Sequence, residues 1–270
     1  MSESTEQPVG ASPVDARAPI DTLERVVAAG KAKASMSAGR TFFLAVLAGI
    51  YIGLGGMLML IVKADQSLPF AASSLLSGAA FSLGLFAVLV AGAELFTGNN
   101  LMVLGLVRYR YGIVPLLRNW GIVYAGNLVG SLVVVTVLAM AGFAGLGGGA
   151  VGEAISVVGA AKASLTFPVA FARGIMCNFL VCLGVWMGFA GRTVADKFLA
   201  ALMPVTAFVA CGFEHCVANM MFLPLAMTQP GGPSPIALAT NLVPVTLGNI
   251  LGGAVLFAGL YALAFRKPRG

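Results

Sequence analysis

The sequence predicts an all-α membrane protein with six transmembrane helices in an inverted 3+3 repeat, in which the second and fifth helices are broken. Three observations predict this fold. Apolar residues make up 59% of the chain and charged residues only 10%, which is more apolar surface than a soluble domain of 270 residues can bury. Six mainly apolar stretches reach the length of about 20 residues that a helix needs to cross a bilayer. One polar pattern also occurs twice, 120 residues apart.

The first element is a polar segment, residues 1–38, which we assign to a cytoplasmic tail. Its first part contains several prolines, and we expect it to be disordered. Apolar residues then recur at helical spacing from Ile20 to Val27, and Asp21 and Glu24 resemble a capping box. This pattern predicts a short amphipathic helix on the membrane surface. We interpret the helix as an interfacial anchor, and a lid over a pore mouth is the alternative.

The transmembrane pore domain follows over residues 39–266, and a short cytoplasmic tail, residues 267–270, ends the chain. The spans are expected at about 41–62, 71–107, 112–141, 166–190, 198–227 and 236–265. The second and fifth are too long for one simple crossing, and each contains polar residues, at 92–100 and 212–219. We therefore expect both to be broken. Between the third and fourth spans lie a glycine-rich stretch and a short helical segment.

The distribution of basic residues predicts how these spans are oriented. Thirteen of the 16 lysines and arginines fall on one side: Arg17, Arg25, Lys31, Lys33, Arg40, Arg108, Arg110, Arg118, Arg192, Lys197, Arg266, Lys267 and Arg269. Only Lys63, Lys162 and Arg173 fall on the other side. By the positive-inside rule both termini are cytoplasmic, in a plasma membrane that is the inner membrane if the cell is Gram-negative. Because these charges flank apolar stretches, the net charge of +6 does not indicate nucleic-acid binding.

The two halves of the sequence share more than one pattern. The motif G-x-E-x4-N occurs at 92–99 and again at 212–219, and the helices that follow share Asn119 and Asn241 with glycines at equivalent positions. Each copy holds three spans, an odd number, so the second copy must be inverted relative to the first. Inverted repeats place the solute site near the middle of the bilayer, between the copies. The shared glycines predict close helix packing.

The two breaks favour an anion. Each half-helix that follows a break points its positive N-terminal end toward the midplane. Glu94 and Glu214 would each cost about 2.5–3.5 kcal/mol if they faced lipid, so we expect them to accept hydrogen bonds from unwound backbone N–H groups. Asn99 and Asn219 belong to the same breaks, and we interpret all four residues as structural.

His215 is the strongest candidate for a functional side chain. It is the only histidine in the sequence and lies beside a break in a spanning segment, where ionisable groups usually mark a solute path. Thr97 in the other break offers a hydroxyl that both donates and accepts hydrogen bonds. Lys162 lies in a charge-poor stretch, and we interpret it as a vestibule lysine that attracts anions. The simpler alternatives are a satisfied core histidine and a solvated loop lysine.

Three segments closely resemble the signatures of the formate/nitrite transporter family: 91–98 (AGAELFTG), 173–187 (RGIMCNFLVCLGVWM) and 212–220 (GFEHCVANM). The resemblance extends from about residue 20 to residue 265. It implies an aquaporin-like protomer with six helices and a homopentamer with one pore per protomer. The solutes that it implies are formate, nitrite and hydrosulfide.

The resemblance also implies roles for individual residues. His215 resembles the central pore histidine of the family and Thr97 resembles its partner in the first broken loop. Lys162 resembles the family's lysine between the third and fourth spans, and Asn178 resembles its pore asparagine. The family's two hydrophobic constrictions fall at Phe81, Leu85, Phe96 and Phe208.

We therefore predict a transmembrane channel or transporter for small monovalent anions, with formate first and proton coupling at His215 as a further hypothesis. Nitrite or hydrosulfide is the alternative within the family, and a neutral small solute is the second alternative. An enzyme is disfavoured because no HExxH, GxSxG or P-loop pattern occurs, and a passive scaffold does not need paired breaks. We expect no cofactor and no metal, since Cys211, His215 and Cys216 lack zinc spacing.

Overall fold

The computed structural model describes residues 15–266, and every regular element in this range is a helix. The expected disordered start and the tail at 267–270 lie outside the described residues. The elements are α1 (Pro19–Ser35), α2 (Ala38–Ala64), α3 (Phe70–Phe81), α4 (Leu83–Ala87), η1 (Val88–Gly92), η2 (Gly98–Met102), α5 (Val103–Val107), α6 (Ile113–Met140), η3 (Phe143–Gly149), α7 (Ala150–Ala163), α8 (Phe167–Ala190), α9 (Val194–Ala210), α10 (Cys216–Met227), α11 (Pro235–Ile250), η4 (Leu251–Phe257) and α12 (Ala258–Ala264).

Within the described range, six helices are long and apolar enough to cross a membrane: Ala38–Ala64, Phe70–Gly92, Ile113–Met140, Phe143–Ala163, Phe167–Ala190 and Pro235–Ala264. The fold class predicted from the sequence is therefore confirmed as an all-α protein with six candidate membrane helices. The identity of one of the six differs from the prediction. The expected fifth span consists of two shorter helices, α9 and α10, whereas Phe143–Ala163 was expected to hold only a short helix.

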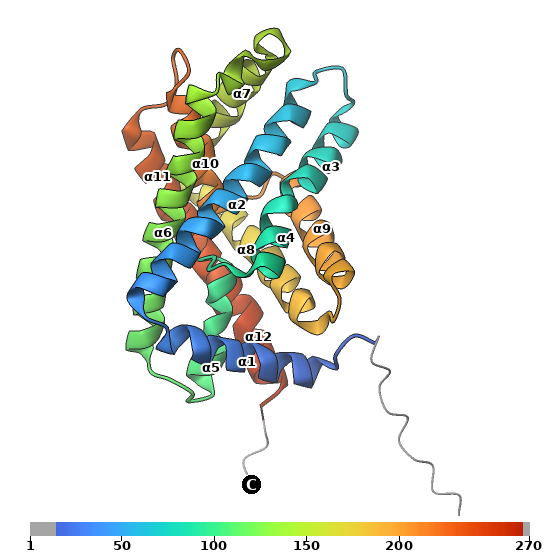
Figure 1. Cartoon of the computed structure of the whole chain (residues 1–270), viewed down its shortest axis with the longest axis vertical. Coiled ribbons are helices and arrows are strands. Elements are labelled where there is room, and N and C mark those ends of the chain that lie inside the picture. The colour runs from blue at the N-terminus through green and yellow to red at the C-terminus, as the bar shows by residue number, and fades with distance from the viewer. Residues whose placement is uncertain (1–14, 267–270) are drawn as a thin grey trace, which may run out of the picture.

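The stretch Phe143–Ala163 contains a kink that limits its reach. Leu146, Gly147 and Gly148 have non-helical backbone angles, so the continuous helix is α7, with 14 residues. At 1.5 Å per residue α7 is about 21 Å long, shorter than the roughly 30 Å hydrocarbon core of a bilayer. Figure 1 shows α7 at one end of the bundle. We therefore assign α7 to the membrane end and not to a crossing.

Two non-helical segments interrupt the bundle. The first, residues 93–97, lies between η1 and η2, and the second, residues 211–215, lies between α9 and α10. Each contains or follows a glycine with a positive φ, +80° at Gly92 and +66° at Gly212. Glycine adopts this left-handed conformation without the penalty that a Cβ atom imposes. The sequence pattern G-x-E therefore begins where each helix ends.

Glycines allow the long helices to pack closely in pairs. A Cβ atom at Gly130 of α6 would overlap the carbonyl oxygen of Val46 in α2, and one at Gly252 of η4 would overlap that of Ile175 in α8. Small residues let helix backbones approach in this way. The predicted close packing at these glycines is confirmed. It brings α6 against α2 and η4 against α8.

Helix α1 lies across one end of the bundle, near α5 and α12, and α7 lies at the opposite end (Figure 1). Arg17, just before α1, donates to the carbonyl oxygen of Phe189 at 3.0 Å, at the C-terminal end of α8. The expected capping box is wrong, because α1 begins at Pro19 without a side-chain cap. Glu24 forms an ion pair with Arg108 at 2.7 Å instead.

Candidate functional site

The centre of the site is a contact between the two non-helical segments. Thr97 Oγ1 lies 2.9 Å from His215 Nε2, and both side chains are buried. Thr97 is the last residue before η2, and His215 is the last before α10. Two residues that are 118 apart in the sequence thus meet where the interrupted helices resume.

The hydrogen bonds of His215 decide which ring nitrogen carries the proton in the neutral side chain. Its Nδ1 accepts from the backbone N–H of Ala218 at 3.1 Å and so caps the first turn of α10. An accepting nitrogen bears no hydrogen, so the neutral ring carries its proton on Nε2. Nε2 then donates to Thr97 Oγ1, which leaves the hydroxyl hydrogen of Thr97 without an acceptor among the described residues.

A polar cluster lies on the α1 side of this contact. Lys33 Nζ, from α1, lies 2.7 Å from Glu94 Oε1 and donates to Asn99 Oδ1 at 2.8 Å. Asn99 Nδ2 donates to Glu94 Oε2 at 2.7 Å and to Asn119 Oδ1 at 2.9 Å. The carboxylate of Glu94 is therefore neutralised by a lysine that comes from the N-terminal helix.

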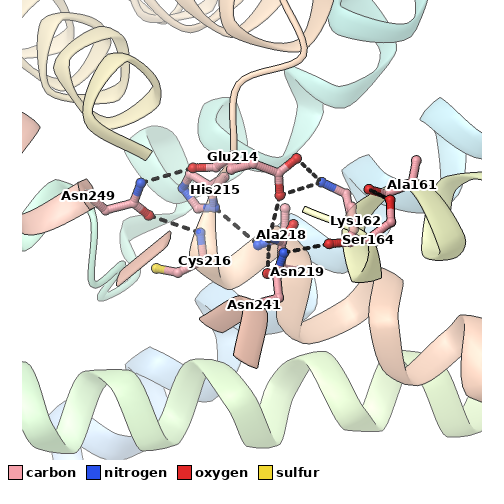
Figure 2. A network of polar contacts seen from close by, with 10 residues as sticks. All are labelled: Ala161, Lys162, Ser164, Glu214, His215, Cys216, Ala218, Asn219, Asn241 and Asn249. Carbon is pink, nitrogen blue, oxygen red and sulfur yellow. Dashed lines mark hydrogen bonds and ion pairs between the residues drawn. The ribbon is translucent and has the colours of Figure 1, made fainter. Parts of the chain in front are cut away.

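A matching cluster lies on the α7 side (Figure 2). Lys162 Nζ, from α7, lies 3.0 and 3.1 Å from the two carboxylate oxygens of Glu214. Asn219 Nδ2 donates to Glu214 Oε2 at 2.6 Å and to Asn241 Oδ1 at 2.7 Å. Both clusters thus contain one lysine, one glutamate and two asparagines. The lysine comes from α1 in the first cluster and from α7 in the second.

The interrupted backbone is held by two further asparagines and not by the glutamates. Asn127 Oδ1 accepts from Phe96 N at 2.9 Å, while its Nδ2 donates to the carbonyl oxygens of Ala45 and Glu94. Asn249 repeats this arrangement: it accepts from Cys216 N and donates to Glu214 O (Figure 2), and it also donates to Gly174 O. The expectation that the glutamates bond the backbone N–H groups is therefore wrong, since their described partners are Lys and Asn side chains.

Each interruption borders a cavity. The larger, of about 310 Å³, is lined by Lys33, Glu94, Leu95 and Asn99, together with apolar residues of α1 and α8. The smaller, of about 70 Å³, is lined on the other side by Lys162, Glu214, His215 and aromatic residues. Because α1 contributes to the lining of the larger cavity, it covers that cavity as well as lying at the end of the bundle.

Aromatic residues narrow the smaller cavity. Phe81 and Phe208 both line it, and their rings meet edge to face with centroids 5.9 Å apart. Phe208 also stacks on the ring of His215, at 6.0 Å. The ammonium group of Lys162 lies 5.5 Å from the ring centroid of Phe222 in the same cavity. The lining of this cavity thus combines aromatic rings with the polar side chains of Lys162, Glu214 and His215.

Two other predicted constriction residues lie elsewhere. Leu85 is buried in α4, and Phe96 packs edge to face against Tyr124, with ring centroids 5.0 Å apart. Of the described residues in this segment, Leu95 lines the larger cavity and Phe96 does not. Whether Leu85 and Phe96 form a constriction stays a prediction.

The predicted pore asparagine, Asn178, lies in a helix contact. Its Nδ2 donates to the carbonyl oxygen of Asn249 at 2.7 Å and to Asn100 Oδ1 at 3.1 Å. A Cβ atom at Gly253 would overlap this amide. Asn178 thus joins α8 to η2 and α11, and its role toward a solute stays a prediction.

Sequence reasoning missed several residues of the site. The sequence indicates for Lys33 only a charge that sets the orientation of the chain in the membrane, because a lysine near the end of an amphipathic helix is usually solvated. Asn127 and Asn249 stood within the repeated motif G-N-[LI]-x-G without an assigned task. Their place in both copies, 122 residues apart, was the available signal, whereas Lys33 and Lys162 do not align by sequence offset.

An all-α bundle with six candidate membrane helices, a buried polar contact between two chain interruptions and a cavity beside each of them defines a membrane channel or transporter. The chain belongs to the formate/nitrite transporter family. The profile described as "Formate/nitrite transporter" matches residues 20–263.

Relatives support this assignment over nearly the full chain. The "Probable formate transporter" of Methanothermobacter thermautotrophicus is 38% identical over 93% of this chain and 98% of that protein. "Formate channel FocA" of Escherichia coli (strain K12) is 34% identical over 95% of this chain and 97% of that protein.

Two solved structures are similar as well. A "Pentameric formate channel with formate bound" has 37% identity and a TM-score of 0.76, over 85% of this chain and 98% of that chain. An "FNT family ion channel" has 31% identity and a TM-score of 0.83, over 91% and 99%. The chain is therefore a multi-pass membrane protein of an anion channel and transporter family.

Proposed function

We propose that the chain transports formate, through one pore in each protomer of a homopentamer. The path leads from the larger cavity beside Lys33, past Thr97 and His215, into the smaller cavity, which Phe81, Phe208 and Lys162 line. Formate is the solute named for relatives at 34–38% identity and for a similar structure whose name also gives the pentamer. We expect no catalysis by this chain.

The contact between Thr97 and His215 is the observation that carries this proposal. Of the N–H groups at the start of α10, that of Cys216 is taken by Asn249 and that of Ala218 by His215. The hydroxyl of Thr97 supplies a donor for the solute, and the positive end of α10 acts on the solute through its field. A small anion accepts such a hydrogen bond, and charge-assisted bonds are shorter and stronger than neutral ones.

Each of the two lysines binds an entering anion by exchanging its glutamate partner for that anion. Each lysine is neutralised by a buried glutamate, so neither cluster carries a large net charge. An anion that enters a cavity competes with the carboxylate for the lysine ammonium group. This arrangement admits an anion without holding it tightly, which conduction requires.

We propose proton coupling at His215 as a second step. Its Nε2–H and the hydroxyl of Thr97 form a chain that ends at the bound anion. The ring must first take up a second proton, because a neutral imidazole that gave up its only N–H would be left as an anion. The doubly protonated ring then passes its Nε2 proton to Thr97, whose hydroxyl proton moves to formate, and the formate loses its charge before it enters the dry aromatic passage. A second proton on the ring would occupy Nδ1 and break the bond to Ala218. Proton uptake by His215 is thus linked to the first turn of α10.

We also infer that the two clusters are the two copies of an inverted repeat. The matched bonds of Asn127 and Asn249, and of Glu94 and Glu214, support this inference. The lysines come from α1 and α7, which lie at opposite ends of the bundle (Figure 1), as inversion requires.

Flux into proteoliposomes tests the transported solute. Purified protein is reconstituted, and uptake of formate, nitrite, hydrosulfide and glycerol is measured at equal concentration. We expect formate to enter fastest and glycerol to be excluded. Faster nitrite or hydrosulfide uptake would assign the physiological solute to that anion, and glycerol flux would contradict an anion path.

A further inference from the structure

An open hollow of about 890 Å³ lies on the outer surface of the bundle, between the end of α5 and the outer face of η4 and α12. It is separate from both cavities of the transport path, because none of its lining residues lines either of them. Figure 1 shows α5 and α12 at the end of the bundle where α1 lies. Its volume falls within the range of about 300–1,000 Å³ that ligand pockets have.

The floor of this hollow is apolar and exposed. Val255, Leu260 and Leu263 follow one face of the helix and are 55%, 57% and 68% exposed. A face of this kind on a membrane helix is covered either by an acyl chain or by another protein.

The rim at the α1 end is basic. Arg108, Arg110 and Arg266 all line the hollow. Arg108 already has partners, Glu24 at 2.7 Å and the carbonyl oxygen of Phe265 at 3.1 Å. The side chains of Arg110 and Arg266 are exposed and have no hydrogen-bond or ion-pair partner among residues 15–266. Two guanidinium groups are therefore free to bind an anion.

The length of the hollow matches one leaflet. From Val255 to Ala264 the helix advances nine residues, which is about 14 Å at the α-helical rise, close to half of the roughly 30 Å hydrocarbon thickness. Tyr109, on the same rim, is 95% exposed, and exposed tyrosines concentrate at the depth of the lipid head groups. When the floor lies among acyl chains, the arginines lie at head-group level.

We propose that this hollow binds an anionic phospholipid, with an acyl chain along Val255, Leu260 and Leu263 and its phosphate between Arg110 and Arg266. Basic pockets next to transmembrane helices bind anionic head groups. A zwitterionic lipid offers the same acyl chains but cancels much of the phosphate charge. The site therefore selects the head group by charge and holds the lipid by apolar contact.

A second copy of the chain fits the hollow less well. It would have to bring two carboxylates to the rim. Of the acidic residues that the structure describes, only Asp21 and Glu153 form no hydrogen bond or ion pair, and Glu153 belongs to α7 at the opposite end. Among residues 15–266, a neighbouring copy thus has at this end one carboxylate without a partner of its own, for two arginines.

Native mass spectrometry of the full-length protein tests the proposal. The protein is released from mixed micelles that contain phosphatidylglycerol and phosphatidylcholine with identical acyl chains, and the retained lipids are counted. The test variant is Arg110→Gln with Arg266→Gln. The control is Lys31→Gln with Arg40→Gln, which removes two exposed basic side chains from other segments. A separate sample receives glycerol phosphate alone.

We expect the wild type and the control to retain phosphatidylglycerol preferentially. In the test variant this preference should fall by about 30-fold. Each basic side chain near the surface raises the affinity for an anionic lipid about fivefold, and the variant removes two of them. An equal loss in both double variants would overturn the proposal, because general surface charge would then explain binding. Retention of glycerol phosphate alone would identify a phosphate site without lipid. Dissociation of the oligomer in the test variant alone would identify an interface between copies.

Discussion

The two ring nitrogens of His215 have different partners, and this difference decides what the side chain offers to a solute. Nδ1 accepts from the backbone N–H of Ala218, and Nε2 contacts the hydroxyl of Thr97. In the proposed path, the histidine therefore acts on an anion through a threonine hydroxyl. A variant that keeps a polar group but does not titrate separates this donor role from proton supply.

Replacing His215 with Asn is expected to abolish accumulation of formate driven by a pH gradient while passive formate conductance persists. Asn retains an oxygen near the start of α10, but it cannot carry a proton from one side of the path to the other. Uptake against the formate gradient and conductance at zero gradient are measured in proteoliposomes. If the variant accumulates formate with wild-type pH dependence, the proton does not come from His215. Thr97→Val, which removes the hydroxyl and keeps the shape, is the matched variant.

The lysine–glutamate pairs predict an order of stabilities. Lys33→Gln leaves Glu94 without its cation, and Lys162→Gln does the same to Glu214. A fully buried pair that loses one partner costs about 3–5 kcal/mol. The side chains of Lys33 and Lys162 are 23% and 13% exposed, so we expect about 2–3 kcal/mol for the first and a larger loss for the second. Thermal unfolding in detergent measures both.

Double variants provide the control for these losses. Lys33→Gln with Glu94→Gln removes both charges, and we expect it to be more stable than Lys33→Gln alone. Equal stability of the single and double variants would show that water screens the carboxylate of Glu94 when its lysine is absent.

At the scale of elements, α1 and α7 have equivalent tasks at the two ends of the bundle. Each brings one lysine to a glutamate beside an interruption. Helix α3 and helix α9 each contribute a phenylalanine to the lining of the smaller cavity, where we expect the two rings to close the path. The cost of taking an ion out of water makes such an apolar passage a barrier.

Shortening Phe81 and Phe208 to Ala together is expected to widen this passage and to relax size selectivity. Removal of two buried phenylalanines also costs stability, about 3–5 kcal/mol each at a fully packed site, so folding is checked first by gel filtration. Uptake of formate is then compared with that of acetate and lactate. Unchanged selectivity in the folded variant would place the barrier elsewhere. Phe86→Ala on α4, whose ring faces Phe198 outside both cavities, is the matched control.

At the scale of the whole molecule, the α1 end contains the basic residues that the orientation rule uses. Arg17 precedes α1, Arg108 follows α5 and Arg266 follows α12, and these three helices lie at that end (Figure 1). We therefore expect both termini in the cytoplasm. A periplasm-active reporter fused to the C-terminus should give no signal, while the same reporter inserted after Gln66, between α2 and α3, should be active. A strong signal from the C-terminal fusion would contradict this orientation.

Most of this architecture can be predicted from the sequence, because residues within each interruption specify where the helix ends. Glycine, glutamate and asparagine at fixed spacing located both non-helical segments, and the apolar runs located the long helices. Partners that come from distant helices were harder to find. The pairing of Lys33 with Glu94 depends on how α1 lies across the bundle, and helix spacing cannot predict that. The bonds of Asn127 depend in the same way on the backbone of α2.

The pairing of each buried glutamate with a lysine also has a consequence for biosynthesis. In both halves the lysine precedes its glutamate in the chain, by 61 and by 52 residues. During synthesis, each lysine is therefore added to the chain before the glutamate with which it pairs. When the interrupted segment enters the membrane, its counter-ion has already been synthesised, so Glu94 and Glu214 need not wait for a later part of the chain to neutralise them.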